Sequence, residues 1–339
     1  MPSMRSAWLL ICSLSASLVG QVEPLQLRVP RGLTSPIPGS QTFKPEVAAL
    51  GRQLFFDPEL SIDRTTACSR CHLPGHGFAS LEALPPGSLG KHATRNAPTL
   101  YNRAWGKSFS WDGKARTLEA QVILPISNPN EMALPLGEAI DRLRKHVGYG
   151  PRFQKLFGQP ANAEDLSSAL AAYVRTLVHG DTVIDSFRAG LGGPLTRAER
   201  GGLWVYESKG GCWKCHSGGN FTDEKFHNTG VGVRAGRPRP ARMAITNNPQ
   251  DAGKFKTPTL RALSETAPYM HDGSQKTLED VVAFYRRGGN ANSHLDSKLL
   301  PLQLTDQEAS NLVAFLRALS RPIRKKKEGR ESAPAPRRK

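Results

Sequence analysis

Two short motifs of the same form constrain this chain more than any other feature of its sequence. Residues 68–72 and 212–216 each read Cys-x-x-Cys-His, with a histidine directly after the second cysteine. Two cysteines at this spacing can both bond to the vinyl groups of one porphyrin, and the adjacent histidine can then ligate its iron. The sequence therefore predicts two covalently bound c-type haems. Their candidate ligands are Cys68, Cys71 and His72 for the first, and Cys212, Cys215 and His216 for the second.

The other interpretations of a Cys-x-x-Cys pair are a zinc site and a redox-active pair. A closed zinc site needs four ligands, whereas the two motifs lie far apart and the one further cysteine, Cys12, lies in the amino-terminal segment. A redox-active pair would not require a histidine at the same place in both motifs. Haem is thus the favoured interpretation, and a zinc-binding module is a distant alternative.

The amino terminus has the pattern of a secretory signal peptide over residues 1–20. Arg5 precedes an apolar stretch at 7–19, which small residues follow. The stretch is too short to predict a membrane span, so no transmembrane segment is expected after cleavage. A lipoprotein attached through Cys12 is an alternative, but the residues before it lack the small side chain that such a site usually has. We therefore expect a periplasmic protein.

The distribution of charge marks one further segment, at the carboxyl-terminal end of the sequence. The formal net charge is +17, and residues 321–339 hold nine Lys/Arg and two Glu. Such a run can bind an acidic partner or a membrane surface, but beside Pro, Ala, Glu and Ser it is more typical of a disordered, solvated tail. An exported protein is not expected to bind nucleic acid.

The pattern of apolar residues predicts a mainly α fold. Helical spacing recurs in both halves of the chain, β-type alternation is scarce, and capping boxes open helices after Thr277 and Thr305. A glycine-rich break at 190–194 is the best linker. We expect a Pro-rich lead segment at 21–43 and two cytochrome c-like haem domains at 44–190 and 191–320, with loosely similar halves but no short repeat. Helices are predicted near 46–56, 118–123, 136–147, 163–179 and 196–208.

Several strings between and around the motifs point to one family. Together with the haem motifs, and in this order, they closely resemble the bacterial di-haem cytochrome c peroxidase family, which includes MauG-type enzymes. The resemblance covers residues 44–320. The strings are LGRQLFFDP at 50–58, RNAPTL at 95–100, WDG at 111–113, NPNEM at 128–132 and APYMHDG at 267–273.

The resemblance implies unequal roles for the two haems. The haem on His72 would be the peroxidatic one, and the haem on His216 would pass electrons. Glu131 matches the distal glutamate over the peroxidatic iron, and a carboxylate suits this place because it can take a proton from one peroxide oxygen and return it to the other. The peroxidatic iron also needs an open distal position, which His92 could occupy in a resting state. Other matches are Gln121 and Pro125 in the distal pocket and Trp111 between the haems.

The same resemblance implies a calcium ion between the domains. Asn96, Thr266 and Pro268 match the residues that contribute to it. Side-chain and main-chain oxygens are the hard donors that calcium prefers. Because Asn96 lies in the first half and the other two in the second, calcium would fix the relative position of the domains.

One position divides the family. Where the classical peroxidases place a methionine that ligates the electron-transfer haem, this chain has Tyr285, as MauG-type members do. A phenolate stabilises ferric iron, whereas a thioether raises the reduction potential. The alternatives are that Tyr285 packs in its helix or that Met270 is the ligand. MauG also has a tryptophan two residues before its second motif, where this chain has Gly210, and Trp213 is not an equivalent placement.

These inferences leave three functions open. The first is a peroxidase that takes electrons from a cytochrome c or similar small protein and passes them to hydrogen peroxide. The second is a MauG-type enzyme that oxidises side chains of a partner protein. The third is a di-haem electron carrier without peroxidase activity.

Overall fold

The computed structural model describes residues 25–192 and 195–323, and over these ranges it confirms a mainly helical fold. The expected signal peptide at 1–20 and residues 324–339 of the tail expected at 321–339 lie outside the described residues, whereas Arg321 and Ile323 form backbone hydrogen bonds with Val183 and Asp181. No helix within the described ranges is long and apolar enough to cross a membrane.

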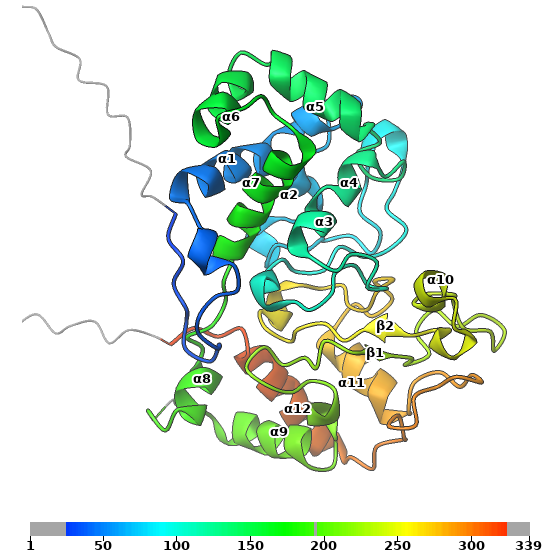
Figure 1. Ribbon diagram of the computed structural model, residues 1–339. Helices are drawn as coiled ribbons and strands as arrows, with labels where there is room; N and C mark the ends of the chain where they lie inside the picture. Colours follow the sequence, from blue (N-terminus) through cyan, green and yellow to red (C-terminus); the bar gives the residue numbers. More distant parts are fainter. Residues whose placement is uncertain (1–24, 193–194, 324–339) are drawn as a thin grey trace, which may run out of the picture.

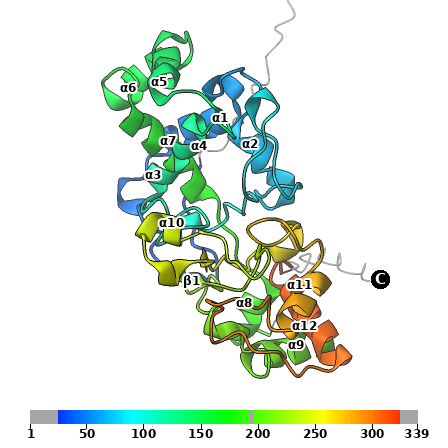
Figure 2. The ribbon, with the colours of Figure 1, turned by 90° about the vertical axis from the view of Figure 1, so that its right-hand side faces the viewer.

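The helices form two groups that follow one another along the chain (Figures 1 and 2). The first group is α1 (Pro45–Phe56), α2 (Cys68–Cys71), α3 (Leu118–Val122), α4 (Leu124–Ser127), α5 (Leu136–Lys145), α6 (Tyr149–Phe157) and α7 (Ala163–Thr176). The second is α8 (Val183–Arg188), α9 (Arg197–Glu207), α10 (Met243–Thr246), α11 (Leu278–Arg286) and α12 (Asp306–Ala318). Two short antiparallel strands, β1 (Phe226–His227) and β2 (Phe255–Lys256), pair with Phe226 opposite Lys256.

Each group is built on one close crossing of two helices. Helix α1 crosses α7 at Gly51, where an added Cβ would lie 1.8 Å from the carbonyl oxygen of Ala169. Helix α9 crosses α12 at Gly202, where an added Cβ would lie 1.9 Å from the carbonyl oxygen of Asn311. Only glycine allows backbones to approach so closely. In both halves the helix that precedes the haem motif therefore packs closely against the last helix of that half, α1 against α7 and α9 against α12.

The halves also share a repeated segment, and the similarity is closer than the loose likeness expected from the sequence. Residues 97–125 align without a gap to residues 257–285, and Pro-Thr-Leu, Asp-Gly and Thr-Leu-Glu recur at matching places. The backbone repeats as well. Short bridges join Phe109 to Ala115 and Tyr269 to Gln275, and the residue after each first partner has a positive φ, 62° at Ser110 and 74° at Met270.

Buried apolar residues form one main cluster in each half. Helices α1, α5, α6 and α7 supply most of the first, and α9, α11 and α12 supply most of the second. Val183 and Ile184 of α8 belong to the second cluster although they precede the glycine-rich break at 190–194. The α8 helix therefore packs with the chain that follows it.

Residues 25–43 of the predicted lead segment run along both halves (Figure 1). On the first half, Trp105 Nε1 donates to the carbonyl oxygen of Thr34 at 2.9 Å. On the second, Gly32 packs on a buried ion pair between Arg261 and Asp185, and Arg261 Nη2 donates to the Gly32 carbonyl oxygen at 3.1 Å. The segment thus ties the two halves together from outside.

Candidate haem sites

Both motif histidines are oriented in the same way. His72 Nδ1 lies 3.0 Å from the carbonyl oxygen of Phe78, and His216 Nδ1 lies 3.1 Å from that of Phe221. A carbonyl oxygen only accepts, so Nδ1 carries the proton and Nε2 is left with its lone pair. Burial lowers the pKa of both histidines, which favours the neutral imidazole that binds metal. Each motif therefore presents a ligand nitrogen prepared for haem iron.

The four motif cysteines are free, half-buried thiols. Burial raises the pKa of Cys68 and Cys212 to about 12 and that of Cys71 to about 11. Zinc binding and thiol exchange both use the thiolate, which these surroundings disfavour. The thiols fit thioether bonds to haem better than either alternative.

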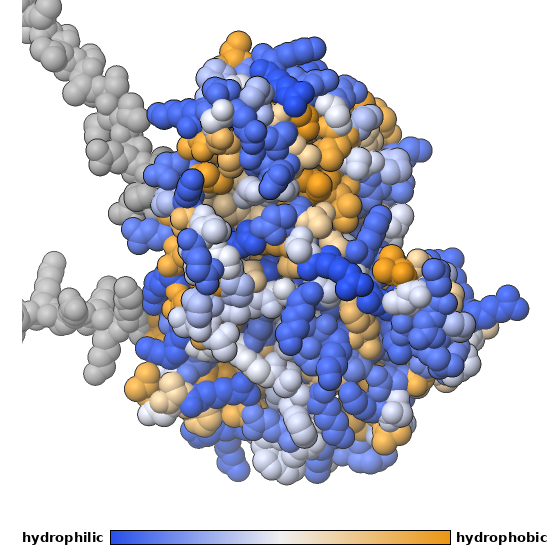
Figure 3. Space-filling model, in the orientation of Figure 1, coloured by the Kyte–Doolittle hydropathy of each residue, from blue (hydrophilic) through white to orange (hydrophobic). Residues whose placement is uncertain are grey.

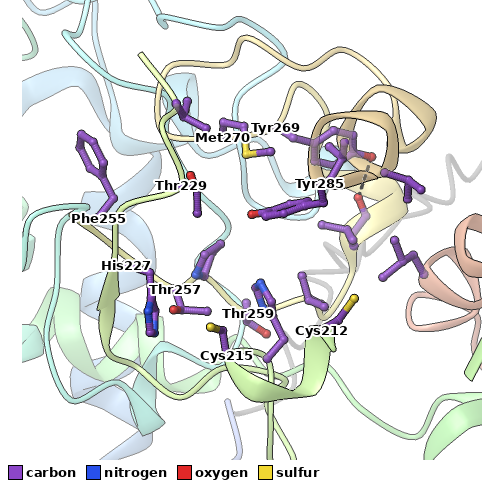
Figure 4. A pocket seen from close by; sticks show the side chains of 18 of the residues that line it. Cys212, Cys215, His227, Thr229, Phe255, Thr257, Thr259, Tyr269, Met270 and Tyr285 are labelled. Carbon is purple, nitrogen blue, oxygen red and sulfur yellow. Dashed lines mark hydrogen bonds between the residues drawn. The ribbon is translucent and has the colours of Figure 1, made fainter. Parts of the chain in front are cut away.

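A largely apolar cavity lies at the second motif. Cys212, Cys215 and His216 line one side of it, and Tyr285 and Met270 line another. In Figure 4 the ring of Tyr285 extends from α11 into the cavity, with its hydroxyl group toward the space above the two cysteines. Residues of the first half, among them Trp111, also line this cavity. An apolar cavity with a histidine and a second potential ligand fits a six-coordinate haem.

Tyr285 is half-buried, and its phenol lines this cavity. Burial raises its pKa, and the nearby thiols of Cys212 and Cys215 act in the same direction. A phenolate here would therefore need a cation beside it, which ferric iron would provide. Met270 also lines the cavity and lies near Tyr285 (Figure 4).

The counterpart of Tyr285 in the first half is Pro125. The gapless repeat aligns α11 with the stretch that contains α3 and α4, and position 285 falls on residue 125. A proline side chain has no atom that can ligate iron. The second half thus carries a potential second ligand at a position where the first half has none.

Polar residues around Pro125 are held by neighbours. Ser110 Oγ lies 2.6 Å from Gln121 Oε1, and Asn128 Nδ2 donates to Glu131 Oε1 at 2.7 Å. Burial raises the pKa of Glu131, although the bond from Asn128 opposes this. Burial is the main cause of the raised pKa of Cys71, and the negative charge of Glu131 is the next largest. This electrostatic effect places Glu131 near the first motif. His92, the other histidine considered for this site, is exposed.

Trp111 lies where the two halves meet. Its Nε1 donates to the carbonyl oxygen of Asn96 at 2.8 Å, and its ring meets that of His271 edge-on with centroids 6.4 Å apart. The carbonyl oxygen of His271 accepts from the backbone N–H of Asn96 at 2.9 Å. Trp111 is therefore fixed in position beside the second cavity.

The three residues expected at calcium line this same cavity. Asn96 Nδ2 donates to the carbonyl oxygen of Glu82 at 3.1 Å, and Thr266 and Pro268 come from the loop before α11. Within the described ranges no hydrogen bond ends on Asn96 Oδ1 or on the carbonyl oxygens of Thr266 and Pro268. The structure therefore brings the three residues into one neighbourhood with uncommitted oxygens.

One feature near the second motif was not anticipated from the sequence. His227 lies between two carboxylates, with Nε2 2.9 Å from Asp223 and Nδ1 2.6 Å from Asp296, and Cys215 is close by. A contact with Cys215 and both carboxylates raise the pKa of His227 to about 9. The spacing of Asp223 and His227 was a local signal for this cluster, but Asp296 lies too far along the chain to give one.

Comparison with known proteins agrees with this geometry. Residues 45–192 match the family model for di-haem cytochrome c peroxidase. The chain is 36% identical to the methylamine utilization protein MauG of Methylorubrum extorquens over 299 residues, covering 87% of this chain and 84% of that protein. It is 31% identical to the cytochrome c551 peroxidase of Nitrosomonas europaea, covering 90% and 86%.

A crystal structure of a MauG-like protein associated with microbial copper homeostasis has the same fold. It superposes with a TM-score of 0.77 at 30% sequence identity, covering 87% of this chain and 94% of that one. The family is one of di-haem oxidoreductases, which implies two c-type haems here. On the two motifs, the repeated fold and these similarities, the chain belongs to the di-haem cytochrome c peroxidase/MauG family.

Proposed function

We propose that this protein is a periplasmic peroxidase that reacts with hydrogen peroxide at the haem on His72. It draws electrons through the haem on His216 from a cytochrome c or a similar donor protein. The observation that carries this proposal is the contrast between Pro125 and Tyr285 at equivalent positions of the repeat. A site without a second ligand is open to peroxide, and a site with one is suited to electron transfer.

The proposed catalytic residues surround Pro125. A haem iron on His72 would supply the centre that binds peroxide and takes up its oxidising equivalents. Glu131 accepts a proton from one peroxide oxygen and delivers it to the other, which leaves as water. The bond from Asn128 holds the Glu131 carboxyl group, and the raised pKa of Glu131 helps it return the proton.

Two further residues are assigned from their contacts. Gln121 is held by Ser110 so that its amide N–H group is free to donate toward the peroxide. Trp111, fixed by its bond to Asn96, is proposed to shorten the electron path between the two haems. The half that ends with α7 would then be the peroxidatic domain, and the half that begins with α8 would be the electron-transfer domain.

We also propose that Tyr285 is the second ligand of the His216 haem and that calcium binds Asn96, Thr266 and Pro268. Both assignments rest on the position of these residues around one cavity. The phenol of Tyr285 reaches into this cavity, and the calcium residues offer uncommitted neutral oxygens.

A MauG-type reaction is the second candidate. In it, the oxidising equivalents would oxidise side chains of a partner protein rather than be reduced by electrons from a donor protein. Tyr285 favours this candidate, because a phenolate stabilises oxidised iron. Gly210 disfavours it, because MauG has a tryptophan at that position.

One experiment separates the candidates. The haem-loaded protein is mixed with hydrogen peroxide and a reduced cytochrome c, and the absorption of both haem proteins is followed. Rapid, repeated oxidation of the donor supports the peroxidase, whereas a long-lived oxidised state with negligible turnover supports the MauG-type reaction. A first haem that stays six-coordinate under all redox and calcium conditions would instead indicate an electron carrier.

Glu131→Gln tests the proposed acid–base residue. Loss of the carboxylate should slow the reaction with peroxide by about 10²–10⁴-fold, the usual contribution of general acid–base catalysis. The matched control is Glu138→Gln on the exposed surface of α5, which should react like the wild type. Equal rates of reaction with peroxide in the two variants would contradict the role of Glu131. If, in addition, the first haem does not react with peroxide, the result would support the electron carrier.

A further inference from the structure

The connection between β1 and β2 carries a dense positive charge. Four arginines fall within residues 234–242, and Asp251 is the one acidic residue between the two strands. Asp251 is already engaged, since it bonds Lys254 at 3.0 Å and Thr246 at 2.8 Å. We call residues 232–242 the arginine loop.

Three of these guanidinium groups face solvent without a countercharge. Arg234, Arg237 and Arg239 are exposed, and none of them forms an ion pair with any residue of 25–192 or 195–323. Arginines elsewhere in this protein commonly pair with a carboxylate, as Arg317 does with Glu279 at 2.7 Å. Asp272 lies beside Gly232 but forms no ion pair with these three arginines, so the arginine loop carries an excess of positive charge.

The loop is held in a defined shape by other groups. Arg234 and Arg237 exchange backbone hydrogen bonds of 3.1 and 2.9 Å, which close a tight turn. Arg242 packs its guanidinium 4.2 Å from the ring centroid of Phe226 and donates to the carbonyl oxygens of Asp112 and Gly113 at 2.9 and 3.1 Å. The charges are thus presented from a scaffold that is anchored to both halves of the protein.

The arginine loop also lies beside the redox machinery. Gly232, at the start of the loop, lies against His271, where an added Cβ would be 3.2 Å from the ring, and Val231 just before it lines the second cavity. After α10 the chain enters β2, where the ring centroids of Phe255 and His271 are 3.5 Å apart and the backbone N–H of Lys256 donates to the carbonyl oxygen of Trp111 at 2.8 Å. Exposed Lys114, next to Gly113, adds positive charge from the first half. The surface therefore adjoins Trp111 and the second cavity.

Shape and polarity suit a transient contact. In Figure 1 the segment around α10 projects from the side of the molecule near the junction of the halves, and in Figure 3 hydrophilic side chains cover this projection beside an apolar patch. Ile245 of α10 is 38% exposed. An apolar spot within a charged rim is the usual composition of a small, short-lived interface.

We propose that the arginine loop is the docking surface for an acidic electron-donor protein. The proposal rests on the proposed function and identifies the partner of the second haem by its charge. Opposite charge speeds encounter and orients the partner without holding it, which is what repeated electron delivery requires. Such a partner would account for three exposed arginines that have no ion pair within the described residues, of which Arg239 also bonds its own loop, from Nε to the carbonyl oxygen of Gly232 at 3.4 Å.

The test is a triple charge reversal, Arg234→Glu, Arg237→Glu and Arg239→Glu, in the haem-loaded protein. The probes are two reduced c-type cytochromes, one of net negative and one of net positive charge, and the second-order rate of donor oxidation is measured against ionic strength. With the acidic donor at low salt, the variant should be slower by about 10–100-fold, and the difference should shrink as salt screens the charges. The basic donor should instead react faster with the variant.

A second variant controls for overall charge. Lys44→Glu, Lys145→Glu and Lys155→Glu reverse three exposed charges on the first half, away from the arginine loop. This control should lose far less rate with the acidic donor. Equal losses in the two variants, or a wild type that prefers the basic donor, would overturn the docking surface. Changed haem content or absorption in the loop variant would also overturn it, because the arginines would then serve the haem carboxylates.

Failure of the proposed function gives a different result. If peroxide does not react with the first haem even in the absence of a donor, the proposed peroxidase function is wrong. Binding of the acidic cytochrome to wild type and variant, measured by calorimetry at low salt, still decides the docking surface. Binding that the charge reversal leaves unchanged would refute it.

Discussion

Asp185→Asn is expected to destabilise the protein strongly, because it leaves a buried arginine without its countercharge. Both oxygens of Asp185 accept from Arg261, at 2.7 and 2.8 Å, and the side chains are 2% and 1% exposed. Breaking one side of a buried pair typically costs about 3–5 kcal/mol. Asparagine keeps the size of the side chain but not its charge, so we expect a loss in this range in the free energy of unfolding.

The matched control is an ion pair of the same length on the surface. Arg286 and Asp306 also meet at 2.7 Å, but their side chains are 40% and 95% exposed. Asp306→Asn should therefore cost less than about 1 kcal/mol. Denaturant unfolding of both haem-loaded variants, followed by far-ultraviolet circular dichroism, measures the difference. Similar losses in the two variants would refute the argument from burial.

The dependence on pH gives a second check. Burial alone would raise the pKa of Asp185, but Arg261 and the bonds from Thr182 together outweigh it, and the pKa falls below the ordinary value of 3.8. A carboxylate with a lowered pKa contributes stability that is complete above its unfolded value and is lost as the pH falls through the folded one. The wild type should thus keep its advantage over Asp185→Asn at neutral pH and lose it only in strong acid. An advantage that disappears between pH 7 and 5 would contradict this.

Two other predictions concern the second haem and the helix crossings. Tyr285→Met should raise the reduction potential of the second haem and change its low-spin signal in electron paramagnetic resonance; an unaltered signal would remove Tyr285 as a ligand. Gly202→Ala should destabilise by about 1–3 kcal/mol or more, because the new Cβ meets the backbone of Asn311. Gly137→Ala, on an open face of α5, should instead be neutral or stabilising by up to about 1 kcal/mol in thermal unfolding.

Local patterns in the sequence were enough to predict much of the helical fold. The capping boxes expected at Thr277 and Thr305 are both formed, with Asp280 and Glu308 as partners. The apolar spacing predicted α1 and α7 close to their observed limits. Caps and apolar stripes depend on residues within a few positions of one another, so a single sequence displays them.

Contacts between distant segments could not be predicted in this way. The pairing of Arg261 with Asp185 and that of His227 with Asp296 join residues far apart in the sequence with no periodic relation. The contacts of Gly32 and Thr34 in the lead segment are of this kind, and the prolines around them gave no sign of them. The assignments of Glu131, Trp111 and the calcium residues came from family resemblance, and they stay predictions that the proposed experiments address.

The gapless repeat has a consequence for how this enzyme can be dissected. Under the proposed function, two copies of one segment within a single chain serve different tasks, so each copy is a reference for the other. Trp111, Gln121 and Pro125 stand where the second copy has His271, Val281 and Tyr285. Exchanging these residues between copies, one pair at a time, would show which side chains make one haem react with peroxide and which make the other transfer electrons.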